Sequence, residues 1–309
     1  MARTTYRWTP ERLAHRLFPV TVVVGWWLAW ASPPGEALRQ WILATVPNQL
    51  ILPIGLLTAT LLITWGTIAF FHRLDETGKP AFLARYKIQT PFSDPLRPTP
   101  AQAALNIGIN HLILVPSIGI AAALLYLRGW DPTAPMGPLW WTLLVVVGMA
   151  LITELAFFSA HYWLHTKWLY KHVHKVHHRY RTSTAWSAQY AHPFEYVMGN
   201  IVPIGLPMVL LAPDPLTIVA FGIVALLNTQ LVHSGYQLPF APWSVPHDLH
   251  HYRVTVNYGS MGIMDRHAAL ITTLQTGEVL VRTGGKEERF AVKGGTVEVL
   301  NNVVTVLAA

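Results

Sequence analysis

The chain has 309 residues, of which 52% are hydrophobic and only 12% are charged. Soluble globular domains carry about 25% charged residues, so this composition excludes an ordinary soluble domain, a disordered chain and a coiled coil. There is no cysteine, which excludes disulfides, thiolate metal sites, Fe–S clusters and cysteine nucleophiles. The net charge of +7 is typical of a membrane protein with basic cytoplasmic loops, and we do not expect a nucleic-acid partner.

Long stretches of the chain contain no charged residue when histidine is counted as uncharged. Crossing a bilayer takes about 20 residues of helix. The first four stretches predict spanning helices, and the last two, which flank Asp214, predict a helical hairpin that re-enters or crosses the membrane. The stretches cover residues 17–35, 40–72, 98–127, 132–153, 196–213 and 215–247.

Basic residues gather in the segments before the first stretch, between the second and third, and after the fourth, whereas the opposite loops hold only Arg39 and Arg128. Four crossings put the three basic segments on one side, which the positive-inside rule predicts to be cytoplasmic. We expect a bacterial inner membrane or an ER-type membrane. No signal peptide is expected, because no small-residue cleavage site follows the first stretch.

Histidines are concentrated in three clusters between residues 161 and 251. The first cluster has the spacing i, i+4, and the other two have the spacing i, i+3, i+4, which places imidazoles on one face of a helix. Single histidines stand at His192 and His233. Under the predicted topology all of them share the cytoplasmic side. The clusters are His161 and His165; His174, His177 and His178; and His247, His250 and His251.

Neutral imidazole is a common ligand for zinc, iron and copper. One ion takes about three to six ligands, so this many histidines suits two metals side by side. Carboxylates near the clusters are expected to support the ligands, and the candidates are Glu154, Glu195 and Asp248. The Glu-x-x-His pattern of carboxylate-bridged di-iron proteins and the His-Glu-x-x-His pattern of metalloproteases are both absent.

Five motifs stand out: RYKIQ, FFSAHYWLHTKWLYKHVHKVHHRY, AQYAHPFEYVMGN, HSGY and HDLHHYRVTVNYGSMGIMDR. They resemble the fatty acid hydroxylase superfamily, and its sterol desaturase and C4-methylsterol monooxygenase branch above all. The resemblance covers about residues 40–266. The family usually has arginine where this chain has Tyr162, and the spacer from His233 to His247 is short, but neither departure removes a ligand.

The resemblance implies a mainly α, polytopic membrane bundle with a cytosolic histidine-rich metal cap. It implies a non-haem di-iron oxygenase that hydroxylates or desaturates a C–H bond of a sterol-like lipid. Such an enzyme uses O2 and two electrons from NAD(P)H, delivered by cytochrome b5, a ferredoxin or a reductase. The eight clustered histidines, with His192 and His233, would bind the metals. We assign catalytic positions to Glu154, Asp248 and Asn257, of which Glu154 and Asn257 match positions of the family.

The tail differs in composition and alternates polar with apolar residues in short runs, which predicts a short β-meander. It resembles the later part of the N-terminal β-sandwich of the ATP synthase epsilon subunit. We therefore expect two domains, residues 1–266 and 267–309, the second an appendage without a catalytic group. The expected strands are 278–283, 288–293, 296–300 and 302–307.

Other functions stay open at this point. A fatty-acyl or carotenoid hydroxylase or desaturase would use the same site. A non-catalytic membrane scaffold would hold structural zinc, and an ATP-synthase-associated protein would depend on the tail. The number of histidines favours the oxygenase over the scaffold, because a structural zinc site needs only about four ligands.

Overall fold

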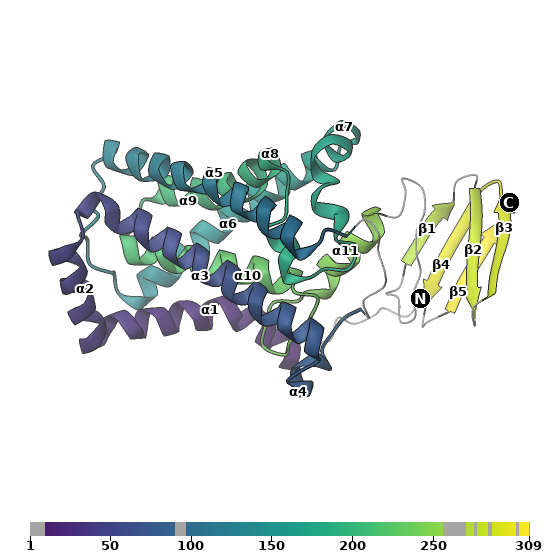
Figure 1. Ribbon diagram of the computed structural model, residues 1–309, viewed down its shortest axis with the longest axis horizontal. Coiled ribbons are helices and arrows are strands. Elements are labelled where there is room, and N and C mark those ends of the chain that lie inside the picture. Colours follow the sequence, from purple (N-terminus) through teal and green to yellow (C-terminus); the bar gives the residue numbers. More distant parts are fainter. Residues whose placement is uncertain are drawn as a thin grey trace. The chain divides into compact units, whose positions relative to one another are not determined.

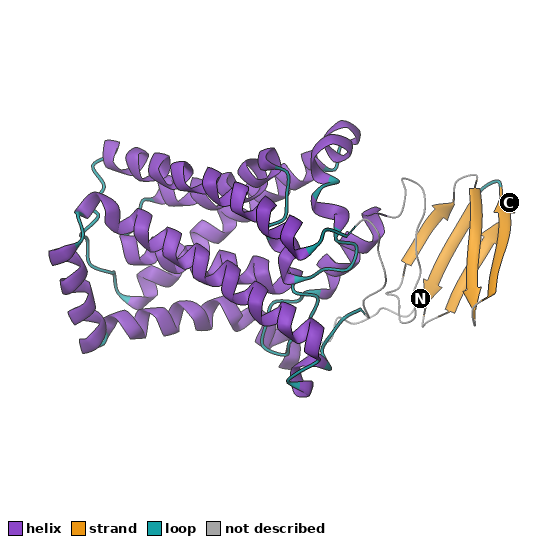
Figure 2. Cartoon of the chain, viewed as in Figure 1, coloured by secondary structure: helices purple, strands orange, loops and turns teal. Residues whose placement is uncertain are grey.

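A computed structural model describes residues 10–89, 97–255, 270–274, 277–283, 286–300 and 303–308. The chain forms two compact units, Met1–Tyr252 and Arg253–Ala309. The described part of the first unit is helical, and that of the second consists almost entirely of strands (Figure 2).

Long helices of the first unit run side by side as a bundle (Figure 1). Within the described residues, five segments are long and apolar enough to cross a membrane, and α1 contributes a shorter apolar stretch, Arg16–Ala31. The predicted polytopic bundle is therefore confirmed. Its members are α1 (Pro10–Ala31), α3 (Asn48–Thr77), α5 (Pro100–Leu127), α6 (Leu139–Leu164), the segment Pro193–Leu211 and α10 (Pro215–His233).

The second predicted span begins later than its charge-free stretch suggests. Helix α2 (Pro33–Thr45) is a separate helix that Ser32 caps by accepting a hydrogen bond from the Gly35 amide. Helix α3 follows after Pro47. A residue that precedes proline is disfavoured in the α-helical conformation, so the chain turns here instead of continuing one helix.

The predicted hairpin is present, but its first half is irregular. It consists of α8 (Pro193–Glu195), the π-helical segment η4 (Tyr196–Ile201) and α9 (Val202–Leu211), followed by α10. Asp214 caps α10 by accepting a hydrogen bond from the Thr217 amide at 2.9 Å. Ala212, between the two arms, has a left-handed backbone conformation with φ of +45°.

Prolines explain the irregular turn and tie it to α6. Pro203 cannot donate an amide hydrogen to the carbonyl of Gly199, and its ring crowds that turn, so the helix widens just before it. Pro207 likewise leaves the carbonyl of Pro203 without a helical donor. Thr153 of α6 fills this place, because its hydroxyl donates to the Pro203 carbonyl at 3.0 Å.

Short elements cover one end of the bundle, where α3, α6 and α10 end and α5 begins (Figure 1). They carry most of the clustered histidines, together with basic residues such as Lys167, Lys171 and Arg179. These elements are α4 (Ala81–Ala84), α7 (Lys167–Leu169), η1 (Tyr170–His174), η2 (His177–Arg179), η3 (Ala185–Ala188) and α11 (Val245–Thr255).

The second unit contains two antiparallel sheets. Strands β2 and β3 pair with each other, and β4 pairs with both β1 and β5. The four expected strands are present, and β1 is an additional one that the sequence did not suggest, since its Thr272-Thr273 pair breaks the alternation. The strands are β1 (Leu270–Leu274), β2 (Gly277–Thr283), β3 (Lys286–Val292), β4 (Gly295–Leu300) and β5 (Val303–Ala308).

Candidate metal centre

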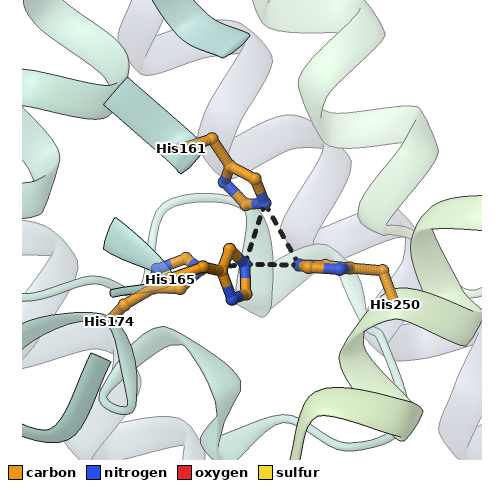
Figure 3. A group of neighbouring side chains, drawn as sticks. All are labelled: His161, His165, His174 and His250. Carbon is orange, nitrogen blue, oxygen red and sulfur yellow. Dashed lines mark hydrogen bonds between the residues drawn. The ribbon is translucent and has the colours of Figure 1, made fainter. Parts of the chain in front are cut away.

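One group of four histidines directs its ring nitrogens toward a common point (Figure 3). His161 lies in the last turn of α6, His165 directly follows that helix, His174 ends η1 and His250 belongs to α11. The Nε2 atom of His165 is 3.1 Å from that of His161 and 3.2 Å from those of His174 and His250. Segments as far apart in the chain as α6 and α11 thus meet at one point.

A second group forms around His177, His233, His247 and His251. The Nε2 atoms of His233 and His247 are 2.7 Å apart, and those of His247 and His251 are 3.1 Å apart. His177 approaches His233 with an Nε2–Nε2 distance of 3.4 Å. In each group the potential ligand atoms all lie within 4.8 Å of one another.

His178 lies between the two groups. Its Nε2 atom is 3.0 Å from that of His174 in the first group, and its ring centroid is 4.8 Å from the rings of both His250 and His251. The two groups are therefore adjacent. The sequence spacing that puts histidines on one helical face distributes them here between two neighbouring points.

Hydrogen bonds to the other ring nitrogens fix the tautomers. His177, His233 and His251 place Nδ1 at 3.0, 2.7 and 3.1 Å from the carbonyl oxygens of Tyr190, Thr229 and Tyr180, respectively. A carbonyl oxygen only accepts, so Nδ1 carries the proton and Nε2 presents a lone pair. In the first group, His174 places Nδ1 at 2.8 Å from the buried carboxylate of Glu195.

Lone pairs that face one another at these distances repel unless a cation lies between them. For metal–nitrogen bonds of about 2.0–2.1 Å, octahedral and tetrahedral geometries separate neighbouring donor atoms by about 2.9–3.4 Å. The observed spacings of 3.1, 3.2 and 3.4 Å fall in this range, and the His233–His247 spacing of 2.7 Å is slightly shorter. Both groups therefore fit a first-row transition-metal ion.

Burial keeps the imidazoles outside the spanning helices neutral. It lowers the pKa of His177 to about 4 and that of His250 to about 3. It also lowers the pKa values of His178, His247 and His251 well below their usual range, with neighbouring histidines adding to the effect. Neutral imidazole is the form that binds metals, so the site is ready for a cation near neutral pH.

A cavity of about 440 Å³ extends from both histidine groups into the helical bundle. Helices α1, α6, α9 and α10 provide its mainly apolar wall, with Val23, Val146 and Phe221 among the lining residues. His161 and His174 of the first group and His233 of the second also line it. An apolar molecule in this cavity would reach the metal centre from within the bundle.

Comparisons with known proteins identify the family. The family model "Fatty acid hydroxylase" matches residues 146–269. Over 191 residues the chain is 31% identical to a very-long-chain aldehyde decarbonylase of Oryza sativa, and the match covers 57% of this chain and 70% of the relative. The chain belongs to the fatty acid hydroxylase superfamily. Both histidine groups lie within the region that the family model covers.

The names of two other relatives of this chain differ from that of the decarbonylase. Fatty acid hydroxylase domain-containing protein 2 of Macaca fascicularis is 30% identical over 229 residues, which cover 74% of this chain and 66% of the relative. A methylsterol monooxygenase of Arabidopsis thaliana is 31% identical over 170 residues, 55% of this chain and 60% of the relative. No solved structure matches.

The C-terminal tail of this chain also matches a family model. The family model "ATP synthase, Delta/Epsilon chain, beta-sandwich domain" matches residues 245–309. This agrees with the resemblance of the tail to the epsilon subunit and with the antiparallel strands of the second unit. The match overlaps the end of the hydroxylase match.

Some expected site residues lie outside the two histidine groups. His192 accepts a hydrogen bond from the Phe194 amide through Nδ1 at 3.1 Å and so caps α8. Asp248 is buried. Its carboxylate accepts hydrogen bonds from the side-chain amide of Gln89 and, at 3.2 Å, from the backbone amide of Ser183. Asn257 lies outside the described residues.

The described hydrogen bonds of Asp248 hold the third histidine cluster in place, and none of them involves a histidine ring nitrogen. Burial raises the pKa of its carboxyl group, and the hydrogen bonds from Gln89 and Ser183 oppose this shift. Since Asp248 directly follows His247, these bonds fix the start of α11. Gln89 ends the RYKIQ motif, so the structure explains why that motif accompanies the histidine clusters.

The sequence did not identify the residues that position His177 indirectly, through the loop it contacts. Asn106 and Asn110 of α5 donate to the carbonyl of Ala191 at 3.1 and 3.2 Å. Asn110 also donates to the carbonyl of Gln189 at 3.2 Å. These bonds fix the loop whose Tyr190 carbonyl orients His177. The i, i+4 spacing of two asparagines in an apolar helix is the signal that would have found them.

Proposed function

We propose that the protein is an integral-membrane non-haem di-iron oxygenase that hydroxylates or desaturates a C–H bond of a sterol-like lipid. The observation that carries this proposal is the pair of neighbouring four-histidine groups at one end of an apolar cavity within a membrane bundle. Oxidation of an unactivated C–H bond needs both a redox metal and a site that excludes water. The cavity and the buried histidines are suited to both needs.

Each histidine group would hold one iron, with His178 as a further ligand between them. We propose that His192 keeps its capping role and does not bind metal. Bound iron would supply the activation of O2 with two electrons from NAD(P)H, delivered through cytochrome b5, a ferredoxin or a reductase. The carbonyls of Tyr190, Thr229 and Tyr180 keep Nε2 deprotonated, and Glu195 orients His174.

The membrane layout supports a cytoplasmic metal site. Basic residues such as Lys171, Lys175 and Arg179 lie on the short elements that carry the histidines, and they are exposed. The positive-inside rule assigns such a face to the cytoplasm. A lipid would enter the cavity from the bilayer, and a soluble electron donor would approach the basic face.

A fatty-acyl or carotenoid hydroxylase or desaturase is the second candidate, since the cavity wall is apolar and the names of the relatives refer to fatty acids, long-chain aldehydes and sterols. A scaffold for structural zinc would need neither the second histidine group nor the cavity. We propose residues 267–309 as an appendage to an oxygenase domain of residues 1–266. None of the described strand residues belongs to either group of potential metal ligands.

The direct test is oxidation by purified protein in lipid nanodiscs, loaded with iron and supplied with a chemical reductant. Sterols, fatty-acyl lipids and carotenoids would be offered under ¹⁸O2, and mass spectrometry would detect a gained oxygen atom or the loss of two hydrogens. We expect product from sterols that disappears in a His178→Ala variant. Product from fatty-acyl lipids or carotenoids alone would favour the second candidate, and no lipid oxidation by iron-loaded protein would contradict an oxygenase.

A further inference from the structure

Helix α6 presents two different faces along its length. Large exposed side chains, among them Leu144, Leu151 and Leu155, form the outer face. A second stripe with spacings of three and four residues lines the cavity, as expected for one face of a helix. This stripe includes Val146, Ala150, Thr153, Glu154, Phe157 and His161. Glu154 is therefore an ionisable residue in the wall of a membrane cavity.

Two asparagines line the same cavity from other segments, Asn200 from η4 and Asn228 from α10. Among the described residues, the side chains of Glu154, Asn200 and Asn228 have no hydrogen-bond or ion-pair partner. The polar neighbours Thr153 and Thr229, in contrast, donate to helical carbonyls. Polar groups without partners are unfavourable in an apolar membrane interior, so these three side chains call for a ligand.

Glu154 and Asn228 lie at a similar depth below the histidines. Glu154 precedes His161 in α6, and a rise of about 1.5 Å per residue separates the two by about 10 Å. Asn228 precedes His233 in α10, and the same rise separates them by about 7–8 Å. Each helix thus carries one metal-site histidine and, deeper in the bundle, one polar side chain facing the same cavity.

We propose that Glu154, Asn200 and Asn228 bind a hydroxyl group of the lipid substrate, deeper in the bundle than the metal-site histidines by about 7–10 Å along the helix axes. The carboxylate accepts a hydrogen bond from the hydroxyl group, and an asparagine amide donates one to the hydroxyl oxygen. The substrate is then a hydroxylated lipid held with its polar group deeper in the membrane than its reacting carbon. This inference rests on the proposed oxygenase function. The separation distinguishes the site from one that oxidises the carbon next to the hydroxyl.

Binding to zinc-loaded protein tests the proposal without any turnover, because zinc is not redox-active. Dodecanol and dodecane differ by one hydroxyl group, and calorimetric titration in the same detergent would compare their affinities. We expect the wild-type protein to prefer dodecanol by about 10-fold or more, as for a hydrogen bond to a charged group. Glu154→Leu and Asn228→Leu should each reduce this preference, and the double variant should abolish it.

Glu76→Leu, at the end of α3 and away from the cavity-lining residues, is the matched control for Glu154→Leu and should keep the full preference. Zinc content in each variant reports whether the site still folds. If the wild-type protein binds no zinc, this would count against the proposed function. If the wild-type protein binds zinc but does not prefer dodecanol to dodecane, this inference would be overturned. A preference that survives in the folded double variant would overturn it as well.

Discussion

At the scale of single residues, the metal centre depends on which nitrogen of each imidazole carries the proton. Tyr180, Tyr190 and Thr229 contribute backbone carbonyls that hold this proton on Nδ1. The sequence identified the histidines because their spacing is periodic. It could not identify these partners, since any residue has a carbonyl and only the folded backbone decides which one is near. The side chains of Tyr180 and Tyr190 therefore gave no signal.

We expect metal-free protein to lose stability in acid, because its histidines are buried. Burial lowers the pKa of His177 to about 4, below the ordinary value of about 6.5. Between these values the unfolded chain binds more protons, so the free energy of unfolding falls as the pH falls through this window. His177 alone would contribute a loss of about 3 kcal/mol.

Denaturant unfolding of chelator-treated protein at pH 6.5 and at pH 4 would measure this loss. A His177→Gln variant, which cannot be protonated there, should show a smaller difference between the two pH values. Equal differences in the two proteins would show that His177 is not a source of the acid sensitivity.

At the scale of elements, the sequence predicted helical histidine clusters but not how the ligands divide. A regular helix would keep His174, His177 and His178 on one face. In the structure the chain passes from η1 to η2 here, and His174 joins the first group while His177 joins the second. Likewise His250 and His251 of α11 belong to different groups. The division depends on where α6 and α10 bring His161 and His233, which local spacing does not encode.

The turn between α9 and α10 offers a test at this scale. Ala212 has φ of +45°, a conformation that costs an L-residue with a Cβ about 1–2 kcal/mol. Ala212→Gly should therefore raise the free energy of unfolding by up to about 1 kcal/mol once the greater freedom of unfolded glycine is included. Thermal unfolding in detergent would show a higher midpoint. Ala220→Gly within α10 is the control and should lower the midpoint, and a lower midpoint for Ala212→Gly would contradict the assigned strain.

At the scale of the whole molecule, absent charge was enough to predict the membrane bundle, because spanning a bilayer imposes a length and an apolar composition on each helix. The cavity was not predictable in the same way. Its wall combines residues as distant as Val23 and Phe221, and the same apolar letters would fill a solid core. The polar residues in that wall, such as Asn228, are single polar residues within apolar stretches of the sequence. Only the folded structure shows that they line the same cavity.

Removal of the tail tests the proposed division of the molecule. A chain that ends at Arg266 keeps every histidine of both groups and loses all the strands. If residues 267–309 are an appendage, this shortened protein should purify from membranes with unchanged metal content and unfold within a few degrees of the full chain. Loss of bound metal on truncation would instead make the tail part of the oxygenase domain.

Metal content is the most direct test of the central claim that the histidines form two neighbouring metal sites. Elemental analysis would compare the purified full-length protein with His250→Ala, which removes a ligand of the first group, and His177→Ala, which removes one of the second. His192→Ala is the control outside both groups. We predict about two iron ions per chain in the wild-type and control proteins and about one in each ligand variant, since each group holds its own ion. Folded wild-type protein without stoichiometric metal, or ligand variants that keep both ions, would contradict it.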